Sequence, residues 1–199
     1  MPREPIAAIL FATCIVVTGA DVSALDLSAI TVQLGAPVAT SDSGWSGGTL
    51  SGSVALDLHG SSAAAPVVLV GTSRGLRGGD QYQDDELSCA YVAMGARFVS
   101  KPLGAARGYL LVGGGIMRAE NRAAYYNPYG GARTVGESTS TGAMALLAIG
   151  AIVALPGTRV AIVAEVSDLI GFTGLPGAVY GDVPRQILVS AGVRVPLRW

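Results

Sequence analysis

The last thirteen residues of the chain alternate between two kinds of side chain. The positions between the apolar ones are mostly small or charged, as at Ser190, Gly192 and Arg194. Because successive side chains of a strand point to opposite faces, this segment is predicted to be a β-strand with one apolar face. An aromatic ring ends the apolar stripe, a position that suits an indole at the edge of a bilayer. The apolar positions are Ile187, Val189, Ala191, Val193, Val195, Leu197 and Trp199.

The composition favours a membrane protein that crosses with strands. Of the 199 residues, 50% are hydrophobic and only 14% are charged, whereas about 25% are charged in an ordinary soluble domain. The chain nevertheless lacks an apolar run of the roughly 18 residues that a spanning helix needs. A membrane barrel resolves this contrast, because its apolar residues are spread over alternate positions. The net charge of -1 gives no reason to expect nucleic acid as a partner.

The N-terminus is predicted to be a signal peptide over residues 1–24. Arg3 lies in a short polar start, residues 6–20 are largely apolar, and Val22-Ser23-Ala24 supplies small residues before a cleavage point. A retained apolar helix is the alternative interpretation. Cleavage after Ala24 would leave Cys89 as the one thiol, which excludes an intramolecular disulfide and favours a structural role for that residue.

The rest of the chain divides into eight short β-like runs that are separated by turn-rich segments. An even number is what a closed antiparallel barrel with both ends on one side requires. The sixth run is apolar on both faces and also fits a helix, but it is too short to span as one. The predicted strands are Ser28–Leu34, Thr49–Leu58, Pro66–Ser73, Ala90–Ser100, Arg107–Met117, Thr141–Ala154, Arg159–Asp168 and Gln186–Trp199.

The connections between these runs alternate in length. Short links carry the Pro and Gly residues of tight turns, as in residues 101–104 and 155–157. Outer-membrane barrels have short turns on the periplasmic side and long loops outside. The predicted long loops are Gly35–Gly48, Arg74–Cys89, Arg118–Ser140 and Leu169–Arg185.

Together these features resemble the small eight-stranded outer-membrane β-barrel proteins of Gram-negative bacteria, the outer-membrane protein A/W-like barrels. The resemblance implies an all-β, closed antiparallel up-and-down transmembrane barrel over residues 25–199, in the bacterial outer membrane and monomeric. In that family the last strand ends in an aromatic residue that the barrel-assembly machinery reads. Val193, Val195, Leu197 and Trp199 match this assembly signal, whereas Pro196 departs from it.

The resemblance also implies two aromatic girdles, although aromatic residues make up only 6% of the chain. The periplasmic girdle is expected to hold Phe98, Tyr109 and Trp199. The other is expected to hold Trp45, Tyr91, Phe172 and Tyr180.

Eight strands enclose an interior just wide enough for side chains to fill, so a porin-sized pore is not expected. The inward parity of the strands carries four charged candidates for lumen ion pairs, Asp57, Arg97, Glu165 and Arg194. A lone buried Glu165 would be costly unless it is paired, and Arg97 across the barrel is its first predicted partner. Strand parity also places Arg159 inside. Such pairs either plug the barrel or line a gated path for a small solute.

No catalytic, cofactor or metal site is predicted. His59 is the sole histidine, and no nucleophile-elbow motif is present. Acidic residues near Asp84 lack the spacing of an EF-hand, which favours a solvated loop over a Ca²⁺ site. Tyr125, Tyr126 and Tyr129 fit either a surface recognition site or interfacial anchors.

The leading prediction is therefore a non-enzymatic outer-membrane barrel that serves as a structural envelope component or binds through its surface loops. Two alternatives stay open at this point. One is a narrow channel or carrier for small or hydrophobic solutes. The other is a secreted soluble barrel of the lipocalin kind, which would need its outward apolar stripes to face water.

Overall fold

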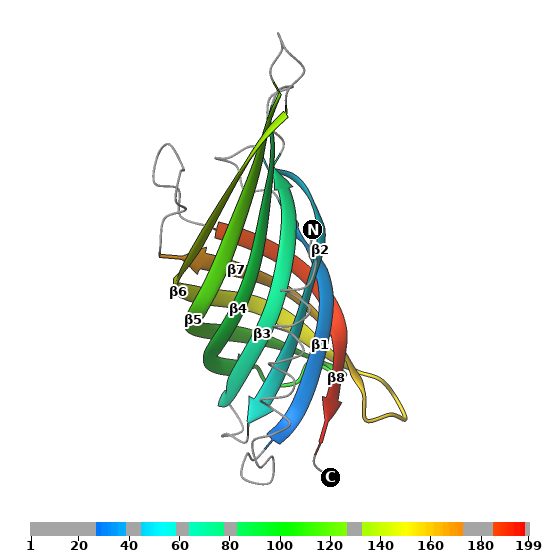
Figure 1. Ribbon diagram of the computed structural model, residues 1–199. Helices are drawn as coiled ribbons and strands as arrows, with labels where there is room; N and C mark the ends of the chain where they lie inside the picture. Colours follow the sequence, from blue (N-terminus) through cyan, green and yellow to red (C-terminus); the bar gives the residue numbers. More distant parts are fainter. Residues whose placement is uncertain are drawn as a thin grey trace.

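The computed structural model describes residues 27–38, 45–58, 64–77, 83–126, 133–172 and 185–197. The predicted signal peptide, His59 and Trp199 lie outside these ranges. The described residues form eight β-strands, one for each predicted run, including the sixth (Figure 1). The strands are β1 (Leu27–Val38), β2 (Trp45–Leu58), β3 (Ala64–Arg77), β4 (Gln83–Val99), β5 (Ala106–Tyr126), β6 (Arg133–Ala154), β7 (Ala161–Gly171) and β8 (Arg185–Pro196).

The eight strands close into a single antiparallel barrel. Each strand pairs with the next one along the chain, and β8 pairs back with β1 over ten positions from Ala29↔Pro196 to Val38↔Ile187. The fold is thus the all-β, closed up-and-down barrel that the alternating runs predicted, and closure leaves no sheet edge within the barrel wall. None of the described residues belongs to a helix that is long and apolar enough to cross a membrane.

The two ends of the barrel differ. At one end, here called the short-turn end, residues 100–105 and 155–160 make tight turns in which Gly104 and Gly157 adopt positive φ angles of 65° and 72°. Glycine takes such angles without steric cost. Arg159 lies in the second of these turns and not on the lumen face, so its inward placement was wrong.

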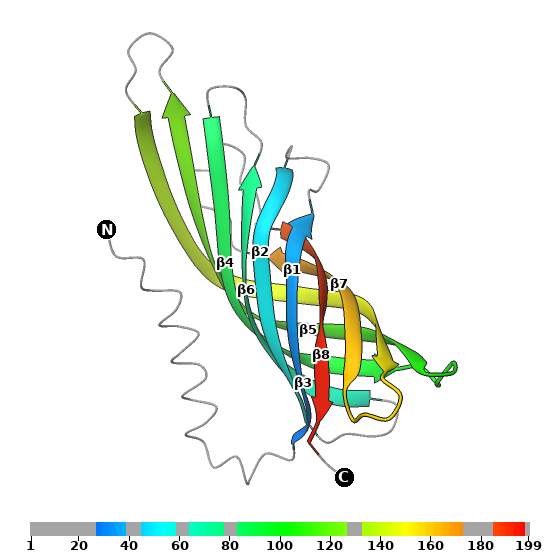
Figure 2. The same ribbon diagram turned by 90° about the vertical axis from the view of Figure 1, so that its right-hand side faces the viewer.

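At the other end, here called the extended end, the strands continue well past their predicted limits. The predicted long loop Arg118–Ser140 is mostly strand, because β5 and β6 stay paired from Ala106↔Val153 to Tyr126↔Arg133. Likewise β4 begins at Gln83, inside the predicted loop Arg74–Cys89. Figure 2 shows β4, β5 and β6 rising beyond the rest of the wall. The extra chain on this side is therefore built as sheet rather than as loop.

The outward side of the wall is apolar over a band of limited height. On β6 every outward position from Ala143 to Val153 is apolar, and Ile149 is 64% exposed. The next outward positions toward the extended end are Thr141, Thr139 and Glu137. A stretch of this length agrees with the roughly 9–11 residues of a membrane-spanning strand. Exposed apolar residues of this kind also lie on β1, β2, β4, β5, β7 and β8, and a soluble barrel would have to leave all of them in water, which contradicts the soluble-barrel alternative.

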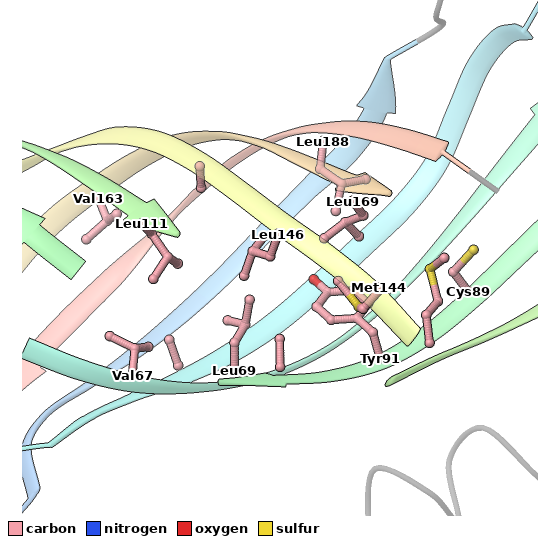
Figure 3. Close-up of a cluster of buried hydrophobic side chains, with 14 of the residues drawn as sticks. Val67, Leu69, Cys89, Tyr91, Leu111, Met144, Leu146, Val163, Leu169 and Leu188 are labelled. Carbon is pink, nitrogen blue, oxygen red and sulfur yellow. The ribbon is translucent and has the colours of Figure 1, made fainter. Parts of the chain in front are cut away.

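The inward side is packed with side chains. A cluster of buried apolar residues runs along the lumen from Val67 and Leu111 to Met144 and Cys89 (Figure 3). The alternation of side chains along β2, β4 and β7 predicted correctly which residues point inward. On β7, for example, Val163 and Glu165 are buried, whereas Ile162 and Val166 are exposed. The interior is thus a core, as expected for eight strands.

Candidate functional site

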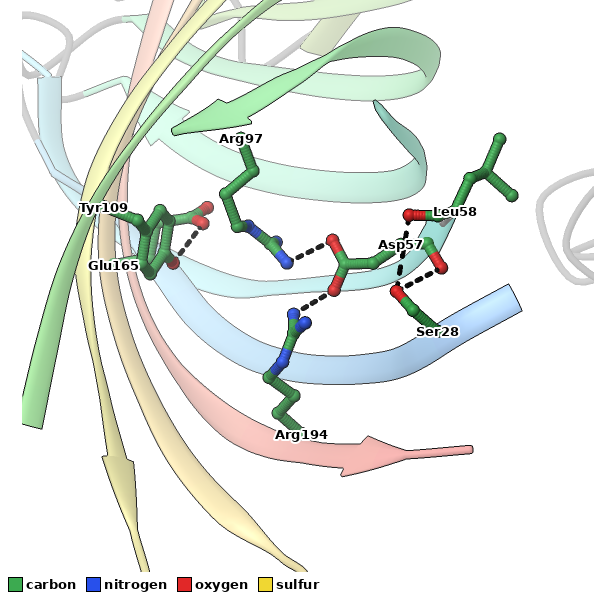
Figure 4. A network of polar contacts seen from close by, with 7 residues as sticks. All are labelled: Ser28, Asp57, Leu58, Arg97, Tyr109, Glu165 and Arg194. Carbon is green, nitrogen blue, oxygen red and sulfur yellow. Dashed lines mark hydrogen bonds and ion pairs between the residues drawn. The ribbon is translucent and has the colours of Figure 1, made fainter. Parts of the chain in front are cut away.

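An ionic network crosses the lumen near the short-turn end. Asp57 of β2 lies between Arg97 of β4 and Arg194 of β8, and each of its carboxylate oxygens accepts from one guanidinium (Figure 4). Asp57 is 0% exposed and Arg97 is 2% exposed. Burial of charges is unfavourable unless each one meets an opposite charge at close range. The three side chains therefore depend on one another.

Glu165 of β7 accepts a hydrogen bond from the Tyr109 hydroxyl at 2.6 Å. The predicted pairing of Glu165 with Arg97 is therefore wrong: the carboxylate that Arg97 meets is that of Asp57. Tyr109 nevertheless links the two, because the Arg97 guanidinium carbon lies 4.9 Å from the centre of its ring. A cation over an aromatic face is attracted by the negative face of the ring.

The four charged residues that strand parity placed in the lumen all lie there. The two carboxylates of Asp57 and Glu165 balance the two guanidinium groups of Arg97 and Arg194. Neutrality of the group removes the need for a bound counter-ion. Chemically, the arrangement can hold five strands together from inside, because its members belong to β2, β4, β5, β7 and β8.

Two glycines make room for the tyrosines of the interior. Tyr109 faces Gly150 across the β5–β6 pair, and Tyr91 faces Gly71 across the β3–β4 pair. A Cβ atom at either glycine would overlap the ring of its tyrosine. The hydroxyl end of each ring therefore lies over the glycine of the neighbouring strand, and Tyr109 reaches Glu165 on the strand beyond.

Gly150→Ala is expected to destabilise the barrel by about 1–3 kcal/mol, because the added methyl group would overlap the Tyr109 ring and the Ala164 carbonyl oxygen and force Tyr109 away from Glu165. Equilibrium unfolding in urea, followed by fluorescence in detergent micelles, measures this. Gly136→Ala is the matched control on the same strand, since a Cβ there meets no atom within 4 Å. Equal stability of the two variants would show that the Tyr109 ring is not held in this way.

Smaller polar pairs complete the interior. Ser53 donates to Gln33 at 3.1 Å, and the Ser73 hydroxyl donates to the Gln186 side chain. No partner was predicted for any of these residues, because an uncharged side chain on the inward face of a strand gives no indication of what it pairs with. They lie on β1, β2, β3 and β8 and extend the polar contacts of the lumen toward the extended end.

Two assignments to the aromatic girdles were wrong. Tyr91 and Tyr109 are buried inside the barrel, 5% and 4% exposed, rather than at the membrane interface. Phe98 and Phe172 do lie on the outer surface. Trp45 belongs to β2, whereas Tyr180 and Trp199 lie outside the described residues.

The acidic segment that was expected to be a loop belongs to β4. Asp84 and Asp85 lie on that strand, and Glu86 forms an ion pair of 2.6 Å with Arg74 of β3. Arg122 of β5 lies 3.0 Å from Glu120 and 3.3 Å from Glu137 of β6. These pairs are on the outward side beyond the apolar band, where a polar surface is compatible with water.

The remaining candidates lie at the two ends of the strands. Tyr125 and Tyr126 are the last residues of β5, at the tip of the extended end, and Tyr129 is outside the described residues. On β8, Val193 and Val195 face outward and are exposed, and the Leu197 amide donates to Ser28 of β1 at 3.0 Å. The apolar stripe of the predicted assembly signal is thus on the outer face of the last strand, as far as it is described.

No protein-family model and no curated protein matches the chain. Among solved structures, neisserial surface protein A is 19% identical, with a TM-score of 0.51 over 85% of this chain and 96% of that protein. A major outer membrane protein of Thermus thermophilus is 14% identical, with a TM-score of 0.51 over 85% of this chain and 99% of that protein.

Both of these proteins are eight-stranded outer-membrane β-barrels. This chain has the fold of that class: a small transmembrane barrel whose outward band is apolar and whose lumen is packed.

Proposed function

We propose that the protein is a non-enzymatic component of the bacterial outer membrane whose barrel anchors a protruding sheet at the cell surface, where the sheet binds a partner. The observation that carries this proposal is the contrast between a filled lumen and strands that continue far past the apolar band. The proposal combines the two roles that the sequence left open, an envelope component and a surface-binding protein.

The filled lumen weighs against a channel or carrier. Residues at several heights of the interior are almost inaccessible: Asp57 and Leu169 are 0% exposed, and Leu111 is 1% exposed. A continuous water path would leave such side chains exposed from one end or the other. Each charged side chain of the described lumen network moreover already has a protein partner: Asp57 pairs with Arg97 and Arg194, and Glu165 accepts from Tyr109.

The protruding sheet is defined by the row of paired residues Thr72↔Ala90↔Arg118↔Thr141, at which the outward face turns from apolar to polar. It comprises this row and the parts of β3 to β6 beyond it, residues 72–77, 83–90, 118–126 and 133–141. Its outward ion pairs, Arg74–Glu86 and Arg122–Glu137, join β3 to β4 and β5 to β6. Since barrels of this class have their longer connections outside the cell, we place the protruding sheet there.

Surface display is tested with a membrane-impermeant maleimide on intact cells of a Gram-negative host. In a Cys14→Ala, Cys89→Ser background, Glu137→Cys is expected to be labelled, because Glu137 is 59% exposed on the protruding sheet. Lys101→Cys, in an exposed turn of the short-turn end, is expected to be labelled only after the outer membrane has been permeabilised.

The reverse pattern would mean that the sheet faces the periplasm, and it would overturn the proposal. Protection of both positions in intact cells would do the same, because neither end would then reach the cell surface.

A further inference from the structure

One edge of the protruding sheet has no partner strand in the part of the chain that the structure describes. β6 pairs with β5 as far as Tyr126↔Arg133, but its pairing with β7 begins only at Met144↔Gly171. One more hydrogen bond, from the Phe172 amide to the Ala143 carbonyl at 2.8 Å, ends that ladder. Over residues 133–142, β6 is therefore paired on one side alone, at the margin of the sheet seen in Figure 2.

The backbone groups on this edge can be assigned from two hydrogen bonds. The Ala154 amide donates to Ala105 on the β5 side, whereas the Ala143 carbonyl accepts on the β7 side. In an antiparallel strand the amide and carbonyl of a residue point the same way, and successive residues alternate. Glu137, Thr139 and Thr141 therefore direct their amides and carbonyls to the open side. Ser138 and Ser140 direct theirs to β5.

The geometry of this edge is regular, unlike that of β2, which borders the protruding sheet on its other side. On that other side, β2 is paired with β1 only as far as Gly35↔Ser51, and its register with β3 shifts at Trp45, Gly48 and Leu50. Bulges of this kind keep a further strand from adding. The β5–β6 register runs without a shift, and residues 133–142 contain no proline and no lysine, two other devices that protect an edge.

The side chains beside the edge are suited to a strand. Thr139 and Thr141 are exposed on the outward face, and β-branched residues favour the extended backbone. Glu137 is also exposed and adds one negative charge, 3.3 Å from Arg122. A row of open amides and carbonyls on a supported strand is the surface to which an extended peptide adds.

We propose that the open edge of β6 at Glu137, Thr139 and Thr141 binds an extended polypeptide segment of an extracellular partner as an additional strand. The segment would be rich in β-branched residues and would place a basic side chain opposite Glu137, since opposite charges across a strand pair attract. This inference rests on the proposed surface display. A second copy of this chain fits less well, because barrels in one membrane hold their β6 strands in the same direction and only the less stable parallel pairing remains.

The experiment reads amide hydrogen exchange by NMR on the full barrel in nanodiscs. In the free protein the amides of Thr139 and Thr141 are expected to exchange at least tenfold faster than those of Ser138 and Ser140. A synthetic peptide of alternating threonine and valine with one central lysine is the probe. Addition of this peptide is expected to slow amide exchange at Glu137, Thr139 and Thr141. The same peptide N-methylated on the alternate amides that would face β6 cannot donate to the edge, and it is expected to leave the three exchange rates unchanged.

Thr139→Pro is the decisive variant, because it removes an amide that faces the open side and leaves the β5–β6 ladder intact. Peptide affinity is expected to fall roughly tenfold or more, in line with a lost hydrogen bond and a steric block. Thr139→Ala, which keeps the amide, is expected to bind as the wild type does. A mobility shift on boiling, read on a gel, checks that both variants are folded.

Three results would overturn the proposal: slow exchange of Thr139 and Thr141 in the free protein, absence of protection by the peptide, or unchanged affinity in Thr139→Pro. The surface labelling of Glu137→Cys is read separately, so a display that succeeds without peptide binding contradicts this inference and leaves the proposed function standing. Concentration-dependent protection of the same amides without any peptide would identify a second copy as the occupant instead.

Discussion

Asp57→Ala is expected to destabilise the folded barrel by about 3–5 kcal/mol, the usual effect of removing one partner from a buried ionic group. The variant leaves Arg97 and Arg194 beside each other with no carboxylate between them, and Arg97 is 2% exposed, so water cannot compensate. Urea unfolding in detergent micelles, followed by fluorescence and by mobility on an unheated gel, measures the loss.

Two controls separate the buried network from charge in general. Glu86→Ala breaks the exposed pair with Arg74 and is expected to change stability by about 0–1 kcal/mol. The combined variant Asp57→Leu, Arg97→Met, Arg194→Leu, Glu165→Gln replaces all four charged side chains of the group with uncharged ones and is expected to recover most of the loss. If Asp57→Ala is no more harmful than Glu86→Ala, the network does not hold the barrel together.

The fold was predictable because its signals are local. Alternation over a few residues specified each strand and its two faces, so that Asp57, Arg97 and Glu165 were placed inside without any knowledge of the closed barrel. The same rule should have placed Tyr91 and Tyr109 inside. Tyr91 lies on the same face of its strand as Arg97, and Tyr109 lies on the same face of its strand as the buried Leu111. Both tyrosines had instead been assigned to the membrane interface because tyrosine is common there, whereas the alternation of faces along the strand predicts their position correctly.

The pairing within the site was not predictable because it depends on the stagger of the strands around the barrel. That stagger is a property of closure and is not contained in any one strand. It places Tyr109, Gly150 and Glu165 in one paired row, and the tyrosine ring then occupies the position in which Arg97 had been expected. The full lengths of β5 and β6 were not predicted, for a related reason. Polar residues such as Thr139 and Glu120 resemble a loop until the neighbouring strand is seen to continue beside them.

Ile149→Arg tests the claim that lipid covers the outward band, and it is expected to destabilise the barrel in bilayer vesicles by about 2–4 kcal/mol. Ile149 is 64% exposed and lies in the middle of the apolar stretch of β6, so a guanidinium there has no water and no counter-charge. The same substitution at Thr141, outward on the same strand and beyond the band, is expected to cost about 0–1 kcal/mol. Unfolding by guanidinium chloride in vesicles provides both values.

The comparison between the two positions decides the matter because the strand, the face and the new side chain are all shared. In water, an arginine is at least as favourable as an isoleucine at an exposed position, so a water-soluble barrel would tolerate Ile149→Arg as well as Thr141→Arg. Equal stability of the two variants would therefore contradict the membrane-spanning arrangement itself. A cost confined to Ile149, and smaller in vesicles of shorter-chain lipid, would instead follow from the depth of this residue in the hydrocarbon layer.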